Sequence, residues 1–466
     1  MMPHPSAIPI KLIVIGHTNV GKTSLMRTLL RDGEFGEVKN ASATTRHVEA
    51  VTLYANDSKP LIILHDTPGL EDGSGVMDFL HEHTDGRDDG VERLESFLKA
   101  VANRDFRLGD DYGQEAKVIN ALLRADVAIY VVDVREPVLS KYKDELAILA
   151  SSGVPVLPVF NFIKDERANF DDWRETLSRR ALHAYQPFDT IAFDFSSEMA
   201  LWDNLGTLTH HPAFAILKHE RTKLWQDMAE MGSLIIADFL INVASFHKKI
   251  NEDDDPTPTF TTMQHATRQA FDIMQQKLLA LYKFYHVQTE HGELTIKGAK
   301  QDIFDSELLT RYGIRTASGS MAGMIVGAGI DVATLGASLG LGTAIGSVLG
   351  GLLPNSGSIK DKVMGVKTLT INDETLALLA MQSQNLHHTL RHLGHASLDI
   401  VRTSHHDTLI WQANKLPTPL KKARAYPHYS SLDGRYDDKK AVRSELSEKL
   451  GDILLSHLGN MEKMPP

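Results

Sequence analysis

Apolar runs separated by mixed polar segments give the first 210 residues a regular pattern. Six short runs are rich in β-branched and aliphatic residues, and helix-length segments separate most of them. Near-continuous apolar runs of this length are typical of strands buried on both faces of a sheet. The pattern therefore predicts an α/β domain with a mostly parallel sheet and helices on both faces. The expected strands are residues 10–16, 47–55, 61–67, 126–134, 154–162 and 189–197.

A polar, acidic stretch interrupts this pattern at about residues 71–120. It surrounds an amphipathic segment at 92–101, which indicates a partly helical insertion. From residue 211 onward the pattern is helical, beginning with a long segment at 214–250. We therefore expect a first domain at 1–210 and a mainly α-helical second domain at 211–466.

Two further helices are expected in the second domain. One follows an acidic, proline-containing connector at 251–259 and carries an apolar stripe that is typical of helix packing. The stripe consists of Phe271, Met274, Leu278, Leu281 and Tyr285. The other helix covers residues 373–393. The histidines in and beside it, His387, His388, His392 and His395, lack a carboxylate at metal-ligand spacing, and we interpret them as solvent-facing.

Residues 321–353 form the most unusual segment. Asp331 is its only charged residue, and several of its glycines are four residues apart. The uncharged part, 332–353, is long enough to cross a bilayer, and small residues at this spacing let membrane helices pack closely. Alternatively, the segment is a close-packed helical hairpin buried in a folded domain. The sequence leaves both readings open, so the segment is a candidate contact for membrane lipid or a protein partner.

Bulk properties narrow the class of protein. The 466 residues fit two domains, and 42% hydrophobic and 23% charged residues are ordinary globular values. The chain has no cysteine, which excludes a disulfide framework and thiolate metal sites. A net charge of −11 makes nucleic acid a less favoured partner. No secretory signal is recognisable, so we expect a cytoplasmic protein that is free, peripheral to the inner membrane or inserted in it.

The strongest chemical signal is GHTNVGKT at residues 16–23, between an expected strand and an expected helix. Its glycines let backbone N–H groups converge on phosphate oxygens at a helix start, as in a phosphate-binding loop. Lys22 would neutralise the β- and γ-phosphates, and the Thr23 hydroxyl would bind Mg²⁺. The expected nucleotide contacts in this loop are Gly16, His17, Thr18, Asn19, Val20, Gly21, Lys22, Thr23 and Ser24.

A second signal, DTPG at residues 66–69, follows the expected strand at 61–67. Asp66 can hold the Mg²⁺ shell through water, and the Gly69 N–H can meet the γ-phosphate. Because it lies about 45 residues after the phosphate-binding loop, DTPG indicates a switch GTPase with GTP and GDP as its ligands.

Between these motifs, residues 42–51 read SATTRHVEAV. The TTRH run resembles the first switch of Era, and TrmE and EngA carry similar Thr-Arg pairs. The resemblance implies that Thr45, with Thr44 as the alternative, contacts Mg²⁺ when the γ-phosphate is present. The whole chain resembles a bacterial family that joins an Era-like GTPase domain to a helical C-terminal domain of unknown function. Lys22, Thr45 and Asn19 are then the candidate catalytic residues.

Two residues bear on the rate of hydrolysis. Asn19 stands where potassium-stimulated members of this group carry an asparagine, which implies a K⁺ ion. Leu70 stands where Ras-like proteins carry the glutamine that orients the attacking water, and an apolar side chain cannot do this. We therefore expect slow hydrolysis, accelerated by K⁺ at Asn19 and by a G-domain homodimer or another partner.

Guanine recognition departs from the usual Asn-Lys-x-Asp motif. Asn161 fits, while Phe162 replaces the lysine, and its ring could stack on the base. Asp165 stands one residue late, so a shifted loop would be needed to bring it to the base. Ser196 and Ser197 resemble the last base-binding loop. The strictness of guanine over adenine stays open.

Three functions fit these observations. The first is a GTP-hydrolysing switch whose helical domain engages a membrane or a protein. The second is a GTPase of ribosome or RNA maturation, although no GxxG loop with basic neighbours is recognisable in the second domain. The third is a nucleotide-stabilised scaffold with negligible turnover.

Overall fold

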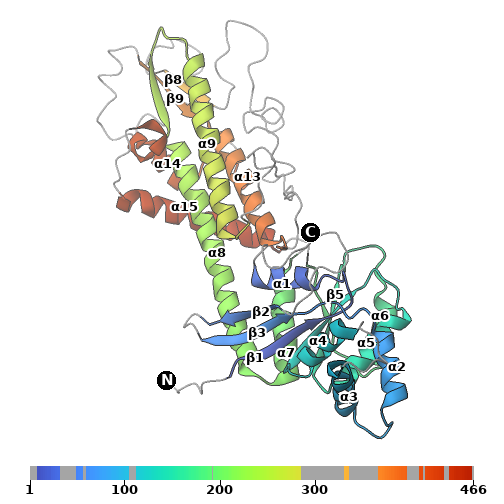
Figure 1. Ribbon diagram of the computed structural model, residues 1–466. Helices are drawn as coiled ribbons and strands as arrows, with labels where there is room; N and C mark the ends of the chain where they lie inside the picture. Colours follow the sequence, from blue (N-terminus) through green and yellow to red (C-terminus); the bar gives the residue numbers. More distant parts are fainter. Residues whose placement is uncertain are drawn as a thin grey trace. The chain divides into compact units, whose positions relative to one another are not determined.

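The chain divides into two compact units, residues 1–225 with 392–398 and residues 226–391 with 399–466 (Figure 1). The computed structural model describes residues 8–31, 49–55, 59–103, 112–190, 193–284, 330–334, 366–395, 409–412, 415–434 and 440–463. Helix α8 (Pro212–Ala244) contributes residues to both units. The domain boundary expected after residue 210 therefore stays a prediction.

A six-stranded sheet of order β2-β3-β1-β4-β5-β6 forms the centre of the first unit. Strands β2 and β3 pair antiparallel and the other neighbours pair parallel, as the sequence predicted. Strands β4 and β5 are buried along their whole length, which explains their continuous apolar sequences. The strands are β1 (Ile10–Ile15), β2 (Glu49–Tyr54), β3 (Pro60–Asp66), β4 (Val127–Asp133), β5 (Val156–Asn161) and β6 (Gln186–Pro187).

The helices of the first unit connect these strands. Besides the start of α8 they are α1 (Lys22–Leu30), α2 (Gly73–His83), α3 (Gly90–Ala102), α4 (Gly113–Leu122), α5 (Ser140–Ser151), α6 (Phe170–Ser178) and α7 (Phe195–Thr209). Helix α3 starts with a capping box between Asp89 and Glu92.

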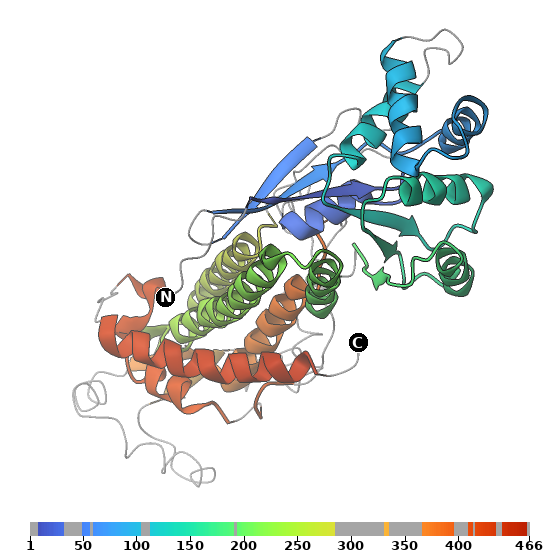
Figure 2. The same ribbon diagram turned by 90° about the horizontal axis from the view of Figure 1, so that it is seen from below.

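The expected insertion forms helices α2, α3 and α4, which gather beside α5 (Figures 1 and 2). Phe79, Leu80, Leu94 and Phe97 from α2 and α3 belong to one buried apolar cluster with residues of β4 and α5. Helix α3 approaches α5 closely, since a Cβ on Gly90 would lie 2.4 Å from the Ser151 carbonyl oxygen. The insertion is therefore part of the core of this unit.

The strand expected at 189–197 is wrong. The sixth strand is the short β6 at Gln186–Pro187, and Phe195 already begins helix α7. Asp194 accounts for the difference, because its carboxylate accepts hydrogen bonds from the Ser197 N–H and from the hydroxyls of Ser196 and Ser197. An N-cap of this kind starts a helix and ends the extended conformation.

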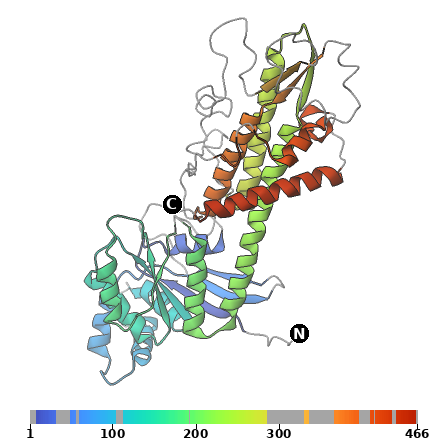
Figure 3. The same cartoon turned by 180° about the vertical axis from the view of Figure 1, so that it is seen from behind.

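The second unit is mainly helical, as expected. Its described helices are the end of α8, α9 (Thr257–Leu281), α13 (Asp373–Arg391), α14 (Thr418–Arg424), α15 (Lys440–Met461) and the short turns η2 (Pro427–Tyr429) and η3 (Ser431–Asp433). Helices α8 and α9 run side by side, and α15 crosses them (Figures 1 and 3). Of the predicted stripe, Phe271, Met274 and Leu278 are buried on α9, which confirms helix packing there. Leu281 is partly buried, and Tyr285 lies outside the described residues.

A three-stranded antiparallel sheet of order β7-β9-β8 completes this unit. Its strands are β7 (His247–Asn251), β8 (Ile330–Thr334) and β9 (Val366–Ile371). Strand β8 corrects the helical reading of the glycine-rich segment at those five positions, whereas residues 321–329 and 335–353 lie outside the described residues. Within the part of the chain that the structure describes, no helix has the length and apolar character that a bilayer crossing needs.

The solvent-facing reading of the histidines is wrong for His387. Its side chain is fully buried, and its Nε2 lies 2.9 Å from the Tyr282 hydroxyl. Burial, together with the Arg391 charge, lowers the pKa of His387 to about 3, so the ring stays neutral at physiological pH. Among the described residues, no three His, Asp or Glu side chains gather as a metal site.

This histidine leaves no room for a side chain on Gly232 of α8. A Cβ at Gly232 would lie 2.3 Å from His387 Nε2, whereas a Cβ at Gly459 of α15 would meet no atom within 4 Å. We predict that Gly232→Ala lowers the free energy of unfolding by about 1–3 kcal/mol, as overpacking of a core does. The matched control Gly459→Ala should raise it by up to about 1 kcal/mol through helix propensity. Urea unfolding measures both, and equal effects of the two substitutions would contradict the close packing.

Candidate nucleotide-binding site

The polar residues of the candidate site lie at the carboxyl ends of neighbouring strands. The register pairs Val14 of β1 with Asp66 of β3, and Asp133 of β4 with Asn161 of β5. The sheet order reverses at β1, whose neighbours are β3 on one side and β4 on the other. Ligands of open α/β sheets bind at such a reversal point.

Backbone conformation explains the glycines of the loop at 16–23. Gly21 has φ 97°, and a Cβ there would lie 2.3 Å from Asn161 Nδ2. A Cβ on Gly16 would lie 2.5 Å from the Val131 carbonyl oxygen. Asn19 also has a positive φ of 65°, a conformation that asparagine tolerates better than most residues. The positive φ alone is thus sufficient to favour asparagine at position 19, independently of the proposed contact with K⁺.

Lys22, the first residue of α1, is folded back onto this loop. Its Nζ donates to the carbonyl oxygens of Gly16 at 3.1 Å and His17 at 2.7 Å. Burial lowers the pKa of Lys22 to about 8, although Asp66 and other nearby carboxylates act in the opposite direction. A buried ammonium group held by neutral carbonyls would gain strongly from a phosphate partner.

Thr23 and Asp66 fit the expected role in Mg²⁺ binding. The Thr23 hydroxyl donates to Asp66 Oδ2 at 2.8 Å, and Asp66 is buried. Oxygen donors of this kind suit Mg²⁺, which binds through few protein groups and completes its shell with water and substrate phosphates. The third expected Mg²⁺ ligand, Thr45, and its alternative Thr44 lie outside the described residues.

The DTPG loop lies directly against the phosphate-binding loop. A Cβ on Gly69 would lie 2.6 Å from the Thr18 nitrogen, so only glycine fits there. The Leu70 N–H donates to the Gly16 carbonyl oxygen at 3.3 Å, and the Thr18 hydroxyl donates to Glu71 Oε1 at 2.9 Å. The Leu70 side chain is buried in the apolar core and carries no polar group toward the loop.

Asn161 connects three parts of the site. Its Nδ2 donates to the Val20 carbonyl oxygen at 3.0 Å. Its Oδ1 accepts from the Phe162 N–H at 2.9 Å and from both the N–H and the hydroxyl of Thr190 at 3.2 Å. The side chain is fully buried and all of these bonds lie within the protein.

Thr190 is a residue that the sequence analysis missed. We expected Ser196 and Ser197 to form the last base-binding loop, but the hydroxyls of both are bound to Asp194 at the start of α7. The structure instead brings Thr190 to Asn161. The Asp-Thr pair at 189–190 was hidden because the apolar residues after it favoured a strand.

The other two predicted base-reading residues already have partners. The Arg135 guanidinium lies 3.6 Å from the centre of the Phe162 ring and makes a bidentate ion pair with Asp133. Phe162 has φ 59°, which is unusual for a bulky residue and is typical of strained functional positions. Asp165 makes a bidentate ion pair with Arg167, and these bonds lower the pKa of Asp165.

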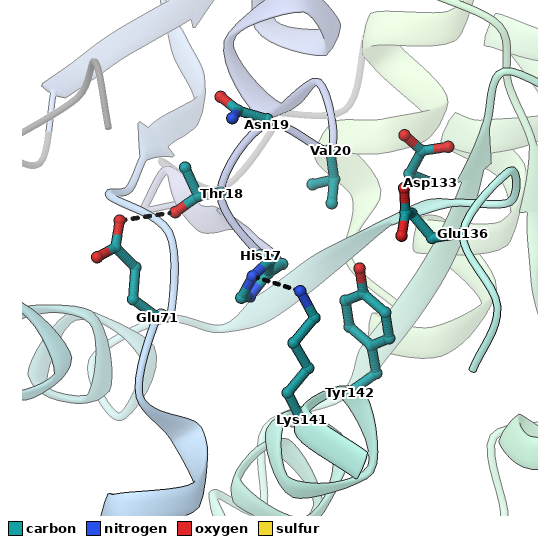
Figure 4. Close-up of a pocket in the computed structure, with 9 residues that line it drawn as sticks. All are labelled: His17, Thr18, Asn19, Val20, Glu71, Asp133, Glu136, Lys141 and Tyr142. Atoms are coloured by element: carbon teal, nitrogen blue, oxygen red, sulfur yellow. Dashed lines mark hydrogen bonds between the residues drawn. The ribbon is translucent and has the colours of Figure 1, made fainter. Parts of the chain in front are cut away.

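A pocket of about 510 Å³ borders the phosphate-binding loop (Figure 4). His17 forms one wall, and its Nδ1 lies 2.8 Å from Glu145 Oε1 and 3.0 Å from the Leu70 carbonyl oxygen. Because both neighbours are acceptors, Nδ1 carries the proton and Nε2 accepts from Lys141 Nζ at 2.9 Å. His17 therefore attaches the loop to α5. The pocket is lined by His17, Thr18, Asn19, Val20, Glu71, Asp133, Glu136, Lys141 and Tyr142.

This sheet order, with a phosphate-binding loop at its reversal point, defines the first unit as an α/β P-loop GTPase domain. Residues 11–162 match the family model described as 50S ribosome-binding GTPase. Residues 174–452 match the model described as a domain of unknown function, DUF3482. Since this second match covers more than half of the chain, the chain belongs to the DUF3482 family.

Individual proteins are also similar to part of this chain. The chain is 28% identical to GTPase Der of Akkermansia muciniphila over 156 residues, 34% of this chain and 26% of the Der length. It therefore spans about a quarter of that relative. Era of Aquifex aeolicus shares 17% identity with a TM-score of 0.30, over 43% of this chain and 57% of Era. A probable GTP-binding protein, engB, shares 14% identity with a TM-score of 0.26, over 43% of this chain and 98% of engB.

The position of Thr190 leads to a direct test. We predict that Thr190→Val, which removes the hydroxyl bound to Asn161, lowers GDP affinity about fivefold, the effect of one hydrogen bond. Ser196→Ala should leave GDP affinity unchanged, because its hydroxyl is bound to Asp194 within the cap of α7. Fluorescence titration with a labelled GDP measures both. A larger loss for Ser196→Ala than for Thr190→Val would restore the serines as the base-binding loop.

Proposed function

We propose that the chain is a GTP-hydrolysing molecular switch whose second unit engages a membrane or a protein partner. The observation that carries this proposal is the buried Asn161, which joins the phosphate-binding loop, the end of β5 and Thr190. A bound nucleotide would place its phosphates on the loop and its base near Thr190. It would therefore contact both ends of this hydrogen-bond network, and binding and network would stabilise each other.

Each side chain has a distinct part in the proposed reaction. Lys22 would exchange its two loop carbonyls for the β- and γ-phosphates, and its buried charge would offset the charge that develops in the transition state. Thr23, Asp66 and Thr45 would hold Mg²⁺, which supplies further neutralisation of phosphate charge. The Gly69 N–H would contact the γ-phosphate.

Guanine selectivity would depend mainly on Asn161 and the loop at Thr190. Asp165 could read the base only by leaving Arg167, and Phe162 would contribute its ring edge or the face that Arg135 leaves open. We therefore propose a preference for guanine that is weaker than that of a standard Asn-Lys-x-Asp motif.

Hydrolysis is expected to be slow, because Leu70 is apolar and buried where a glutamine would orient water. We predict that the unmodified chain releases phosphate from GTP over multiple turnovers. Lys22→Ala should lower kcat about 100-fold, as the loss of a transition-state hydrogen-bond donor does. The control Lys99→Ala should match the unmodified chain, because Lys99 is an exposed residue of α3. A colorimetric phosphate assay measures all three. Failure of the unmodified chain to turn over would favour a nucleotide-stabilised scaffold.

The same assay separates the two reasons for asparagine at position 19. Asn19→Gly keeps the positive φ but removes the amide oxygen that would bind K⁺. If K⁺ acts there, the ratio of rates in potassium and sodium salts falls to about one in this variant. Rates measured over a range of protein concentrations report the contribution of a G-domain homodimer.

A partner of the second unit would act through residues 321–353. Strands β8 and β9 pair antiparallel, with Thr334 opposite Lys367. If residues 335–365 crossed a bilayer once, Thr334 and Lys367 would lie on opposite sides of it. Their pairing in one sheet is therefore incompatible with a single crossing. Two crossings need roughly 40 residues, more than 335–365 provides. We therefore propose shallow attachment to a bilayer, with the protein otherwise in the cytoplasm, or contact with another protein.

Vesicle flotation distinguishes these partners. We predict that the full chain floats with phosphatidylethanolamine and phosphatidylglycerol vesicles, more strongly with a non-hydrolysable GTP analogue than with GDP. A variant in which a short Asn-Gly turn replaces residues 335–365 keeps β8 and β9 joined as a hairpin and should not float. No flotation in either nucleotide state would reject lipid and favour a protein contact.

Ribosome maturation is the second candidate function. The description of the family model that matches residues 11–162 names 50S ribosome binding. Sedimentation with 50S subunits in the presence of the same two nucleotides would test it. Nucleotide-dependent comigration without vesicle flotation would favour this candidate over membrane attachment.

A further inference from the structure

The start of helix α4, with the residue just before it, lies against the DTPG loop and the beginning of helix α2. Gln114 Nε2 donates to the Gly69 carbonyl oxygen at 2.6 Å. The buried Glu115 accepts from the Asp72 N–H at 3.2 Å. The Tyr112 hydroxyl would lie 2.3 Å from a Cβ on Gly75. One helix start therefore touches residues 69 to 75 at three places.

The contact at Gly69 fixes a peptide group with little restraint of its own. Glycine has no side chain to limit its torsions, so its neighbours must set the orientation of the peptide that follows it. Here the carbonyl of that peptide is bound by Gln114, and its N–H, on Leu70, is bound by the Gly16 carbonyl. The peptide is thus held on one side by the phosphate-binding loop and on the other by α4.

Gln114 also supplies the side-chain amide that position 70, a leucine in this chain, lacks. Leu70 directs its side chain into the apolar core, whereas Gln114 is partly exposed and reaches the adjacent residue from a different element. The carboxamide has two donors and an acceptor, and one donor is used on Gly69.

We propose that Gln114 is a positioning residue of the second switch. Through the Gly69 carbonyl it fixes the peptide that follows Gly69, and so limits where the loop can place the neighbouring Gly69 N–H that is expected to meet the γ-phosphate. The position of α4 then depends on that contact. The position of the insertion then depends on whether the γ-phosphate is present. Loss of the Gln114 side chain would leave the contacts to the α- and β-phosphates in place. This inference rests on the proposed function, since it concerns the same nucleotide.

The test compares nucleotides that differ only at the γ-phosphate. Gln114→Met keeps the length of the side chain and removes the amide, and Gln114→Ala removes both without harming the helix. For each variant, affinity is measured for GDP and for a non-hydrolysable GTP analogue, together with kcat for GTP. The control is Asn120→Ala, an exposed residue of the same helix.

Gln114→Met is expected to bind the GTP analogue about fivefold more weakly, the effect of one lost hydrogen bond. GDP affinity should not change, and kcat should fall about tenfold or more. Equal losses for both nucleotides would show a structural role only, and unchanged binding of both would also overturn the inference. If the unmodified chain binds neither nucleotide, the proposed function fails and this inference fails with it. If it binds both and the variants match it, only the inference fails.

Discussion

The hydrogen bonds of Asn161 are the constraint on which the candidate site depends. A buried amide whose oxygen and nitrogen both make hydrogen bonds fixes its neighbours strongly, because any movement would leave a polar group unsatisfied away from water. Asn161 Nδ2 bonds the Val20 carbonyl and its Oδ1 bonds Thr190. The loops after β1, β5 and β6 therefore cannot shift independently. Gly21 is required by the same contact, since a Cβ there would overlap the Asn161 amide.

Much of the first unit could be predicted from the sequence. Strands buried on both faces give continuous apolar runs, and glycine spacing in the loop at 16–23 follows from the approach of backbone to phosphate. These are local rules, so Gly16, Lys22, Thr23, Asp66 and Gly69 could be named in advance. The structure brings Lys22, Thr23 and Asp66 together, whereas Thr45 lies outside the described residues.

Contacts between distant segments could not be predicted. Thr190 reaches Asn161, and Gln114 reaches Gly69, across 29 and 45 positions of the chain. Neither residue belongs to a motif with fixed spacing. The serines after Thr190 resemble the last base-binding loop of GTPases. In the structure, however, Asp194 accepts hydrogen bonds from Ser197 and caps the start of α7. In the second unit, His387 looked exposed because its helix is rich in polar residues, yet it lies buried against Tyr282.

Where the first unit departs from the usual motifs, a neighbouring element supplies an alternative partner. Phe162 replaces a lysine, and Arg135 from the loop after β4 covers its ring and is itself held by Asp133. His17 in the phosphate-binding loop is held by Glu145 and Lys141 of α5. Leu70 offers no polar group, and α4 binds the residue before it. Each of these partners belongs to β4, the loop that follows it, α5 or the insertion, and residues of all these segments share one apolar cluster. Each departure from the usual motifs is therefore matched by a contact from one packed region of the unit, so consistency across the site is kept even though Phe162 retains a strained backbone.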